Sequence, residues 1–274
     1  MPNIKETPVM QKAEMQLSKS AFAMNNIHQP IIVVIDNSGS MLNIEDGEIK
    51  TNLQLAEDLV NEIGSDPNLS LSEQQAIDFA VLNFHDNVEV RQSWIPLSQF
   101  ERNIKIPYGG CTSFYQAVIQ SILSCKLLFE QYKESGISCK RPQIFLFTDG
   151  YPTDDENFDK ARELCKNYLE GTNPKCRLHV ILLPGASDKA AKSLSSEVRT
   201  YLTKDCQHGL PTALDFINSS MVTFSSTAIG EGCNLQMNAK YMVAGSAFGK
   251  VNKNTGVCTV HESIDLSDNY AFAS

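Results

Sequence analysis

The chain has 274 residues, of which 42% are hydrophobic and 20% charged, and its formal net charge is −9 at pH 7. This length and composition suffice for one large domain with appendages. The negative charge argues against nucleic acid or an anionic membrane as the main partner, because both repel an acidic surface. We find neither an apolar signal core near the start nor a segment long enough to span a bilayer, and we expect a cytoplasmic protein.

Eight cysteines are spread along the chain, and none forms a Cys-x-x-Cys pair. They are Cys111, Cys125, Cys139, Cys165, Cys176, Cys206, Cys233 and Cys258. Most fall within predicted helices or strands. This distribution favours reduced thiols in a cytosolic protein over a disulfide framework.

The first third of the chain predicts an arm followed by strands and one helix. Residues 1–28 are polar and lack a sustained hydrophobic period, so we expect a mobile N-terminal arm. The run Ile31-Ile32-Val33-Val34-Ile35 is entirely β-branched, which is typical of a strand buried on both faces of a parallel sheet. A helix is predicted over 46–63 and a second strand over 76–84. The alternation from Val88 to Trp94 predicts a third strand, which follows a short loop and should be an antiparallel edge.

The middle of the chain alternates helices with strands. Helices are predicted over 113–136, 153–169, 188–202 and 212–224, strands over 143–148 and 178–183, and a weak edge strand within 203–210. Two of the helices should open with capping boxes, Ser113-x-x-Gln116 and Thr153-x-x-Glu156. Because the helices are long enough to cross over between parallel strands, the pattern predicts a doubly wound α/β fold with a mostly parallel sheet and helices on both faces.

Residues 227–274 depart from this rhythm. Short β-prone runs at 241–244 and 257–260 lie between glycine-rich and serine-rich patches, and Lys253-Asn254-Thr255-Gly256 predicts a hairpin turn. We therefore expect one domain over 29–226 and a small β-prone extension over 227–274 that packs on it.

Small side chains that carry oxygen follow three of the predicted elements. They are Asp36, Ser38, Ser40, Thr112 and Asp149. In a doubly wound sheet, ligands bind outside the carboxyl ends of the strands, where the strand order reverses. If the strands that precede Asp36 and Asp149 are neighbours, both carboxylates lie at that point, and Gly109-Gly110 lets the backbone bring Thr112 to them. Carboxylate and hydroxyl oxygens suit a hard divalent cation such as Mg²⁺.

Three motifs in these loops resemble the metal-ion-dependent adhesion site (MIDAS) of von Willebrand factor type A (VWA) domains. They are Asp36-Asn37-Ser38-Gly39-Ser40-Met41, Gly110-Cys111-Thr112 and Thr148-Asp149-Gly150. The runs from Tyr132 to Ile137 and from Arg141 to Asp154 look closest to the bacterial tellurium-resistance (TerY-like) branch of that family. The resemblance covers about residues 20–226.

The resemblance implies particular roles for the five residues. Ser38, Ser40 and Thr112 would ligate Mg²⁺ directly, with Mn²⁺ and Ca²⁺ as alternatives. Asp36 and Asp149 would act mainly through bound waters or as hydrogen-bond partners. The sequence departs from the family at Cys111, which separates the double glycine from Thr112. Such an insertion moves the hydroxyl by a few ångströms, so Ser113 is an alternative ligand.

A metal-dependent phosphoryl-transfer enzyme is the first rival interpretation. Aspartate-nucleophile phosphatases carry Asp-x-Asp where this chain has Asn37-Ser38 after the first aspartate, and no phosphate-binding loop motif is present. Ser38 or Ser40 as nucleophile requires a histidine base, for which only His85 and His208 are candidates, and His85 lies in the hairpin predicted at the sheet edge. We assign surface or core roles to all five histidines and expect no catalytic activity.

Two further rivals are a zinc site and a metal-free structural module. The zinc site would draw on Cys206, His208, Cys233, Cys258 and His261. Only Cys258-x-x-His261 has ligand-like spacing, so buried free thiols are the preferred interpretation. In a metal-free module, Asp36 and Asp149 would repel each other in one crevice without a compensating cation.

The sequence thus predicts a non-catalytic, Mg²⁺-dependent protein-binding domain. Its partner would offer an acidic side chain to the metal, and resemblance to the tellurium-resistance branch implies a bacterial cytoplasmic stress complex. Six acidic residues are expected to rim the site, so that lysines or arginines of the partner would surround its ligating carboxylate. They are Glu45, Asp46, Glu48, Asp154, Asp155 and Glu156. The sequence does not determine the oligomeric state.

Overall fold

The structure is a computed structural model that describes residues 9–10, 27–44, 49–170, 175–245 and 247–264. Most of the expected N-terminal arm therefore lies outside the described residues. Of its described residues, Met10 is buried in the core cluster that includes α3 (Phe114–Ser135), and the Val9 N–H donates to Gln120 Oε1 at 2.6 Å.

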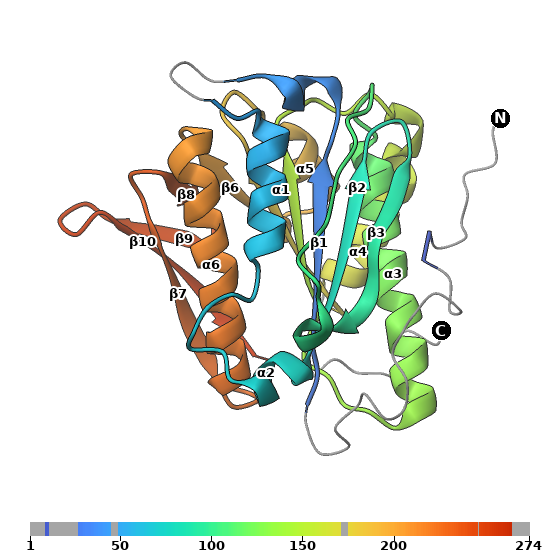
Figure 1. Cartoon of the computed structure of the whole chain (residues 1–274), viewed down its shortest axis with the longest axis vertical. Helices are drawn as coiled ribbons and strands as arrows, with labels where there is room; N and C mark the ends of the chain where they lie inside the picture. Colours follow the sequence, from blue (N-terminus) through green and yellow to red (C-terminus); the bar gives the residue numbers. More distant parts are fainter. Residues whose placement is uncertain (1–8, 11–26, 45–48, 171–174, 246, 265–274) are drawn as a thin grey trace.

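A seven-stranded sheet with the order β3-β2-β1-β4-β5-β6-β8 forms the centre of the molecule (Figure 1). Its strands are β1 (Gln29–Asp36), β2 (Ile77–Phe84), β3 (Val88–Pro96), β4 (Gln143–Thr148), β5 (Arg177–Leu182), β6 (Arg199–Thr203) and β8 (Met242–Ala244). The five inner strands run parallel, and β3 and β8 pair antiparallel at the two edges. The predicted doubly wound fold and its antiparallel edge strand, β3, are confirmed, and β8 adds a second antiparallel edge that was not predicted.

The strand order reverses at β1. The chain continues from β1 to β2 and β3 on one side, and then crosses over to β4, which pairs with β1 on the other side. All eight residues of β1 are buried, as its β-branched run predicts for a strand covered on both faces. The carboxyl ends of β1 and β4 therefore lie together where such folds bind ligands.

Helices cover both faces of the sheet (Figure 1). They are α1 (Asn52–Glu62), α2 (Leu71–Ala76), α3, α4 (Phe158–Leu169), α5 (Lys189–Leu194) and α6 (Cys206–Ser226). Side chains of β1 alternate between two core clusters. Ile31, Val33 and Ile35 pack in the cluster with α1 and α6. Ile32 and Val34 pack in the cluster with α3, α4 and α5.

Two helices near the start differ from the prediction for local reasons. The helix predicted over 46–63 begins at Asn52, because Thr51 and Gln54 form a capping box there. The short helix α2 was not predicted. None of its residues is buried, so it has no hydrophobic period, and its signal is the capping box of Ser70 with Glu73.

The largest error concerns residues 188–210. The predicted helix 188–202 ends at Leu194 and is followed by β6, a strand held between β5 and β8. The weak edge strand predicted within 203–210 was also wrong. Asp205 accepts a hydrogen bond from the His208 N–H and starts α6 six residues before the predicted start at Thr212.

The two predicted capping boxes in the middle of the chain do not form. Ser113 is the N-cap of α3 but makes no side-chain capping bond. The helix predicted from Thr153 begins at Phe158, after the 3₁₀ turn η4 (Asp155–Asn157).

The C-terminal strands continue the core. β7 (Gly232–Asn238), β10 (Val257–Ser263) and β9 (Gly249–Asn252) form an antiparallel sheet, in which Val251 pairs with Cys258 as the predicted hairpin requires. Gly256 takes φ of +68° in its turn, a conformation that favours glycine. Leu235 and Met237 are buried in the same cluster as α1 and α6. The extension and the domain therefore share one hydrophobic core.

Candidate metal centre

Asp36 and Asp149 lie next to each other at the carboxyl ends of β1 and β4. Asp36 is the last residue of β1, and Asp149 directly follows the last residue of β4, Thr148. The strands pair with Ile35 opposite Phe147. The Thr148 hydroxyl donates to Asp36 Oδ2 at 2.6 Å, so the two strand ends are joined by a side-chain hydrogen bond.

The serines of the first loop connect these carboxylates. The Ser38 backbone N–H donates to Asp36 Oδ1 at 2.9 Å, which turns the chain directly after the strand. The Ser38 and Ser40 hydroxyl oxygens are 3.1 Å apart, and the Ser40 hydroxyl donates to Asp149 Oδ1 at 2.8 Å. Four of the five predicted residues are therefore linked by a continuous series of hydrogen bonds.

Thr112 reaches the same place from the loop before α3. A Cβ atom built on Gly150 would lie 3.1 Å from Thr112 Oγ1 and 3.8 Å from Asp36 Oδ2. The hydroxyl and the carboxylate thus both lie against the backbone of Gly150, where the missing side chain leaves room for them. Ser113, the alternative ligand, is the N-cap of α3 and donates its backbone N–H to the His85 carbonyl at 2.8 Å.

The loop between β2 and β3 supports the Thr112 loop. A Cβ atom on Gly109 would lie 2.1 Å from His85 Cγ, so the packing of this ring requires glycine. Asp86 Oδ1 accepts from the Cys111 N–H at 3.1 Å. Backbone hydrogen bonds from Gly39 to Gly110 and from Gly109 to Asn37 then join the Thr112 loop to the first loop.

Asn37 ties the first loop to the sheet. Asn37 lies between Asp36 and Ser38 in the sequence and is fully buried. Its side-chain N–H donates to the Pro107 carbonyl. Its Oδ1 accepts from Asn83 Nδ2 at 2.9 Å, and Asn83 in turn accepts from Arg91. The sequence analysis missed these positioning residues. One signal in the sequence could have indicated them: Asn83 is a polar residue near the end of a strand that is otherwise mostly apolar.

Asp154 holds the third loop against α3. The residue is 4% exposed, and its carboxylate accepts from the backbone N–H groups of Tyr115 at 3.2 Å and Gln116 at 2.8 Å. Thr112 and Thr153 exchange two further hydrogen bonds, each 3.0 Å long. Asp154 therefore caps a helix, and its expected place on an exposed acidic rim was wrong.

The other members of the expected rim fall into two groups. Asp155 and Glu156 are exposed in η4, whereas Glu45, Asp46 and Glu48 lie outside the described residues.

Burial disfavours negative charge on both central carboxylates. It raises the pKa of Asp36 to about 6, although hydrogen bonds from Thr148 and Ser38 oppose the shift. The neighbouring Asp149 charge raises the pKa of Asp36 further. Burial likewise raises the pKa of Asp149. A proton or a cation at this point therefore stabilises the pair.

The oxygens gathered here are of the kind that Mg²⁺ and Ca²⁺ prefer, because carboxylates and hydroxyls are hard ligands. Ser40 is exposed and Asp149 is half-buried, whereas Asp36, Ser38 and Thr112 are buried. The cluster thus has a buried floor and one side that faces solvent.

The residues considered for a zinc site have other surroundings. Cys206 and Cys258 are buried in the core, and His208 stacks on Tyr241 with ring centroids 4.6 Å apart. His261 is exposed and hydrogen bonds with Asn234. Within the described part of the chain, no three histidine, cysteine, aspartate or glutamate side chains are placed to hold a metal ion together.

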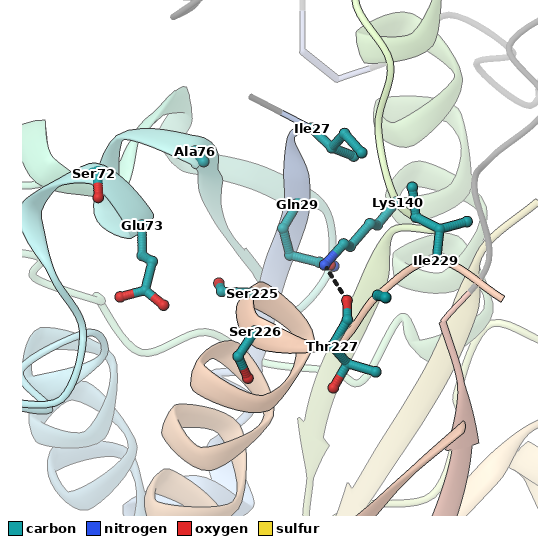
Figure 2. A pocket seen from close by; sticks show the side chains of 11 residues that line it. Ile27, Gln29, Ser72, Glu73, Ala76, Lys140, Ser225, Ser226, Thr227 and Ile229 are labelled. Carbon is teal, nitrogen blue, oxygen red and sulfur yellow. Dashed lines mark hydrogen bonds between the residues drawn. The ribbon is translucent and has the colours of Figure 1, made fainter. Parts of the chain in front are cut away.

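A cavity of about 440 Å³ lies near the start of β1, at the end opposite Asp36 (Figure 2). Its lining includes Ile27, Gln29, Glu73, Lys140 and Ile229. The Lys140 ammonium donates to the carbonyls of Phe224, in the last turn of α6, and of Thr227, its C-cap. The cavity is therefore separate from the candidate metal centre.

None of the helices described is both long and apolar enough to cross a membrane.

Comparisons with known proteins reveal similarity in fold. No family model and no curated protein sequence matches the chain. The PilB minor pilin of Streptococcus sanguinis matches with a TM-score of 0.50 and 12% identity, over 74% of this chain and 64% of that one. The pilus adhesin SpaC of Lactobacillus rhamnosus GG matches with a TM-score of 0.51 and 11% identity, over 89% and 38%.

The ArnB paralog VWA2 of Sulfolobus acidocaldarius also matches, with a TM-score of 0.46 and 20% identity over 70% of this chain and 45% of that one. The chain thus spans between 38% and 64% of the length of these three structures. The likeness to the two pilus proteins shows that this chain shares their α/β fold.

Proposed function

We propose that this chain is a non-catalytic VWA-type domain that binds a protein partner through a divalent cation. The observation that carries the proposal is the convergence of three loops at the point where the strand order reverses. Five residues meet there, and each supplies a carboxylate or hydroxyl oxygen. They are Asp36, Ser38, Ser40, Thr112 and Asp149.

Mg²⁺ fits this donor set, with Mn²⁺ and Ca²⁺ as alternatives. Two neighbouring carboxylates whose charge is disfavoured by burial require a compensating positive charge. The resemblance to the MIDAS assigns direct ligation to the hydroxyls of Ser38, Ser40 and Thr112. Thr112 Oγ1 and Asp36 Oδ2 both lie beside the position that a Cβ atom on Gly150 would take, which supports Thr112 over Ser113 as the third of these ligands.

A protein partner would complete the coordination through an Asp or Glu side chain, since Mg²⁺ binds carboxylate oxygen readily. The solvent-facing side of the cluster, next to Ser40, leaves room for that group. The match to a pilus adhesin is compatible with a binding role. The runs from Tyr132 to Ile137 and from Arg141 to Asp154 support, by analogy alone, a place in a bacterial cytoplasmic complex for stress or tellurium resistance.

The surroundings of the hydroxyls and carboxylates support the absence of catalysis. The Ser40 hydroxyl donates to the Asp149 carboxylate rather than to a histidine base. Asp36 is fully buried, and its two oxygens accept hydrogen bonds from Ser38 and Thr148. A carboxylate in this state is poorly placed to attack a phosphoryl group.

Unfolding experiments with and without the metal test the proposal. At about 100 times its dissociation constant, Mg²⁺ should stabilise the wild-type fold by about 2.7 kcal/mol, because it binds only the folded state. Asp36→Ala should abolish this gain. Because that change empties a buried position, Ser40→Ala provides a second variant at an exposed position.

The control for both variants is Asp155→Ala, which removes an exposed carboxylate near the site and should leave the metal-dependent gain unchanged. Urea-unfolding curves of the wild type that coincide in MgCl₂, MnCl₂, CaCl₂ and EDTA would contradict the proposal.

A further inference from the structure

Large apolar side chains are exposed in the loops that form the candidate metal centre. In the described part of the chain nine large hydrophobic side chains are exposed, and five of them belong to these loops. We call these five the apolar loop patch. They are Leu42, Ile44, Ile49, Tyr108 and Tyr151.

The patch is close to the predicted ligands. Leu42 ends the 3₁₀ turn η2 (Gly39–Leu42) that contains Ser40, and Tyr151 follows Asp149 by two residues. Tyr108 precedes Gly109, whose N–H donates to the Asn37 carbonyl at 2.7 Å. This bond and the one from the Gly39 N–H to the Gly110 carbonyl join the two loops, so the patch residues lie at the same end of the sheet as the ligand oxygens.

Ile44 and Ile49 belong to the segment that leads from η2 to α1. The Asn52 N–H donates to the Asn43 carbonyl at 3.1 Å, which holds the start of α1 beside the end of the first loop. Ile49 is 92% exposed. Exposed large apolar groups beside a polar centre mark interaction surfaces, and tyrosine is enriched in them.

The charges around the patch restrict the partner further. Asp86, in the loop between β2 and β3, and Asp155 and Glu156, in η4, are exposed and acidic. The exposed cation beside Ile49, Lys50, is paired with Asp58. Beyond its ligating carboxylate, a partner with further acidic side chains would be repelled here. The residues nearest to the metal-bound group would instead face aromatic and aliphatic side chains.

We propose that the acidic residue offered by the partner is flanked by large apolar residues that pack on the apolar loop patch. This inference rests on the proposed metal-dependent binding and specifies its partner. It replaces the expectation that lysines or arginines immediately surround the ligating carboxylate. Basic residues belong farther out, opposite Asp86 and Asp155.

A peptide selection tests this specificity directly. The probe is a phage-displayed library of linear peptides with a central Asp or Glu and random flanks, bound to the full chain in MgCl₂ and eluted with EDTA. We expect the eluted peptides to be enriched in Phe, Tyr, Trp, Leu, Ile and Met within three positions of the acid. Enrichment of Lys and Arg alone, or no flanking preference, would overturn the inference.

Matched surface variants separate the patch from the metal centre. Tyr108→Ser combined with Tyr151→Ser should weaken binding of a selected peptide at least tenfold. Val251→Ser is the matched control. Val251 is also exposed, at 48%, but it lies on β9 in the C-terminal sheet, so its substitution should leave binding unchanged. Equal peptide affinity of the double variant and the wild type would exclude the patch as the docking surface.

The metal-dependent stabilisation distinguishes the two ways to fail. The double variant should retain the Mg²⁺-dependent gain in stability, which shows that its metal centre is intact. If the wild type lacks that gain, the proposed function itself fails. If the gain is present but the selected peptides lack apolar flanks, the metal proposal stands and the inference about the partner fails.

Discussion

Asp154 connects two of the three loops at the candidate metal centre. Its carboxylate comes from the loop after β4 and accepts the backbone N–H groups of Tyr115 and Gln116 in the first turn of α3. These N–H groups have no partner within the helix, so the carboxylate caps it from outside. Thr112 immediately precedes this turn and is thereby held in place.

The pKa of Asp154 yields a prediction about pH. Burial raises it from 3.8 to about 6, although the two N–H donors oppose the shift. The folded state therefore holds this proton more tightly than the unfolded state does. The resulting stabilisation is fully present below pH 3.8 and is lost as the pH rises through about 6.

Asp154→Asn keeps an oxygen acceptor but cannot ionise. From pH 4 to pH 7, the unfolding free energy of the wild type should fall relative to this variant by about 1–3 kcal/mol. Urea unfolding of both proteins in EDTA measures the difference, from which the titration of Asp36 largely cancels. Asp155→Asn, whose side chain is exposed, is the control. A difference independent of pH would contradict the prediction.

At the scale of elements, the end of α6 depends on a lysine from another part of the chain. Lys140 precedes β4, is 7% exposed and donates to the carbonyls of Phe224 and Thr227 (Figure 2). Carbonyls in the last turn of a helix lack partners within it, and a buried one without a partner costs free energy. Lys140 thus holds the C-terminal end of α6 against the segment that precedes β4.

Lys140→Met should therefore lower the unfolding free energy by about 1–3 kcal/mol, because it keeps the aliphatic stem and removes the donor. Lys204 offers a matched control. Its ammonium donates to the Ala239 carbonyl at 2.9 Å, but its side chain is exposed, so Lys204→Met should cost less than about 1 kcal/mol. Equal losses from the two substitutions in urea unfolding would show that burial of the bond is unimportant.

At the scale of the whole molecule, the C-terminal strands complete the fold. β8 pairs with β6 at one edge of the sheet, and the buried side of β7 and β10 contributes Leu235, Met237 and Val260 to the core shared with α1 and α6. Removal of these strands would expose that apolar surface to water.

We expect the C-terminal strands and the rest of the domain to unfold together in one cooperative transition. Trp94, the only tryptophan, is fully buried in β3 at the opposite edge of the sheet and reports on that edge. Its fluorescence and the far-ultraviolet circular dichroism should give the same urea midpoint. A chain truncated after residue 226 should lose several kcal/mol of stability at Trp94 as well. An unchanged Trp94 midpoint after truncation would show that the extension folds independently.

The sequence determined the features that depend on local pattern. The five β-branched residues of β1 predicted a strand buried on both faces, and alternating strands and helices predicted the doubly wound sheet. The five oxygen-bearing residues were also identified from their positions after predicted elements, and the structure places them together. Their role in binding a metal stays a prediction.

Only the tertiary structure decided features that depend on contacts between distant segments. The sequence around residues 188–202 has a helical pattern, but pairing of Leu202 with Val243 helps to hold its last part as β6. Ser113 and Gln116 have the spacing of a capping box, but Asp154 caps α3 instead. A pattern in a short window contains no information about a partner forty residues away. For this reason the residues that position the site, such as Asn37, Asp86 and Asp154, became evident only once the loops were seen together.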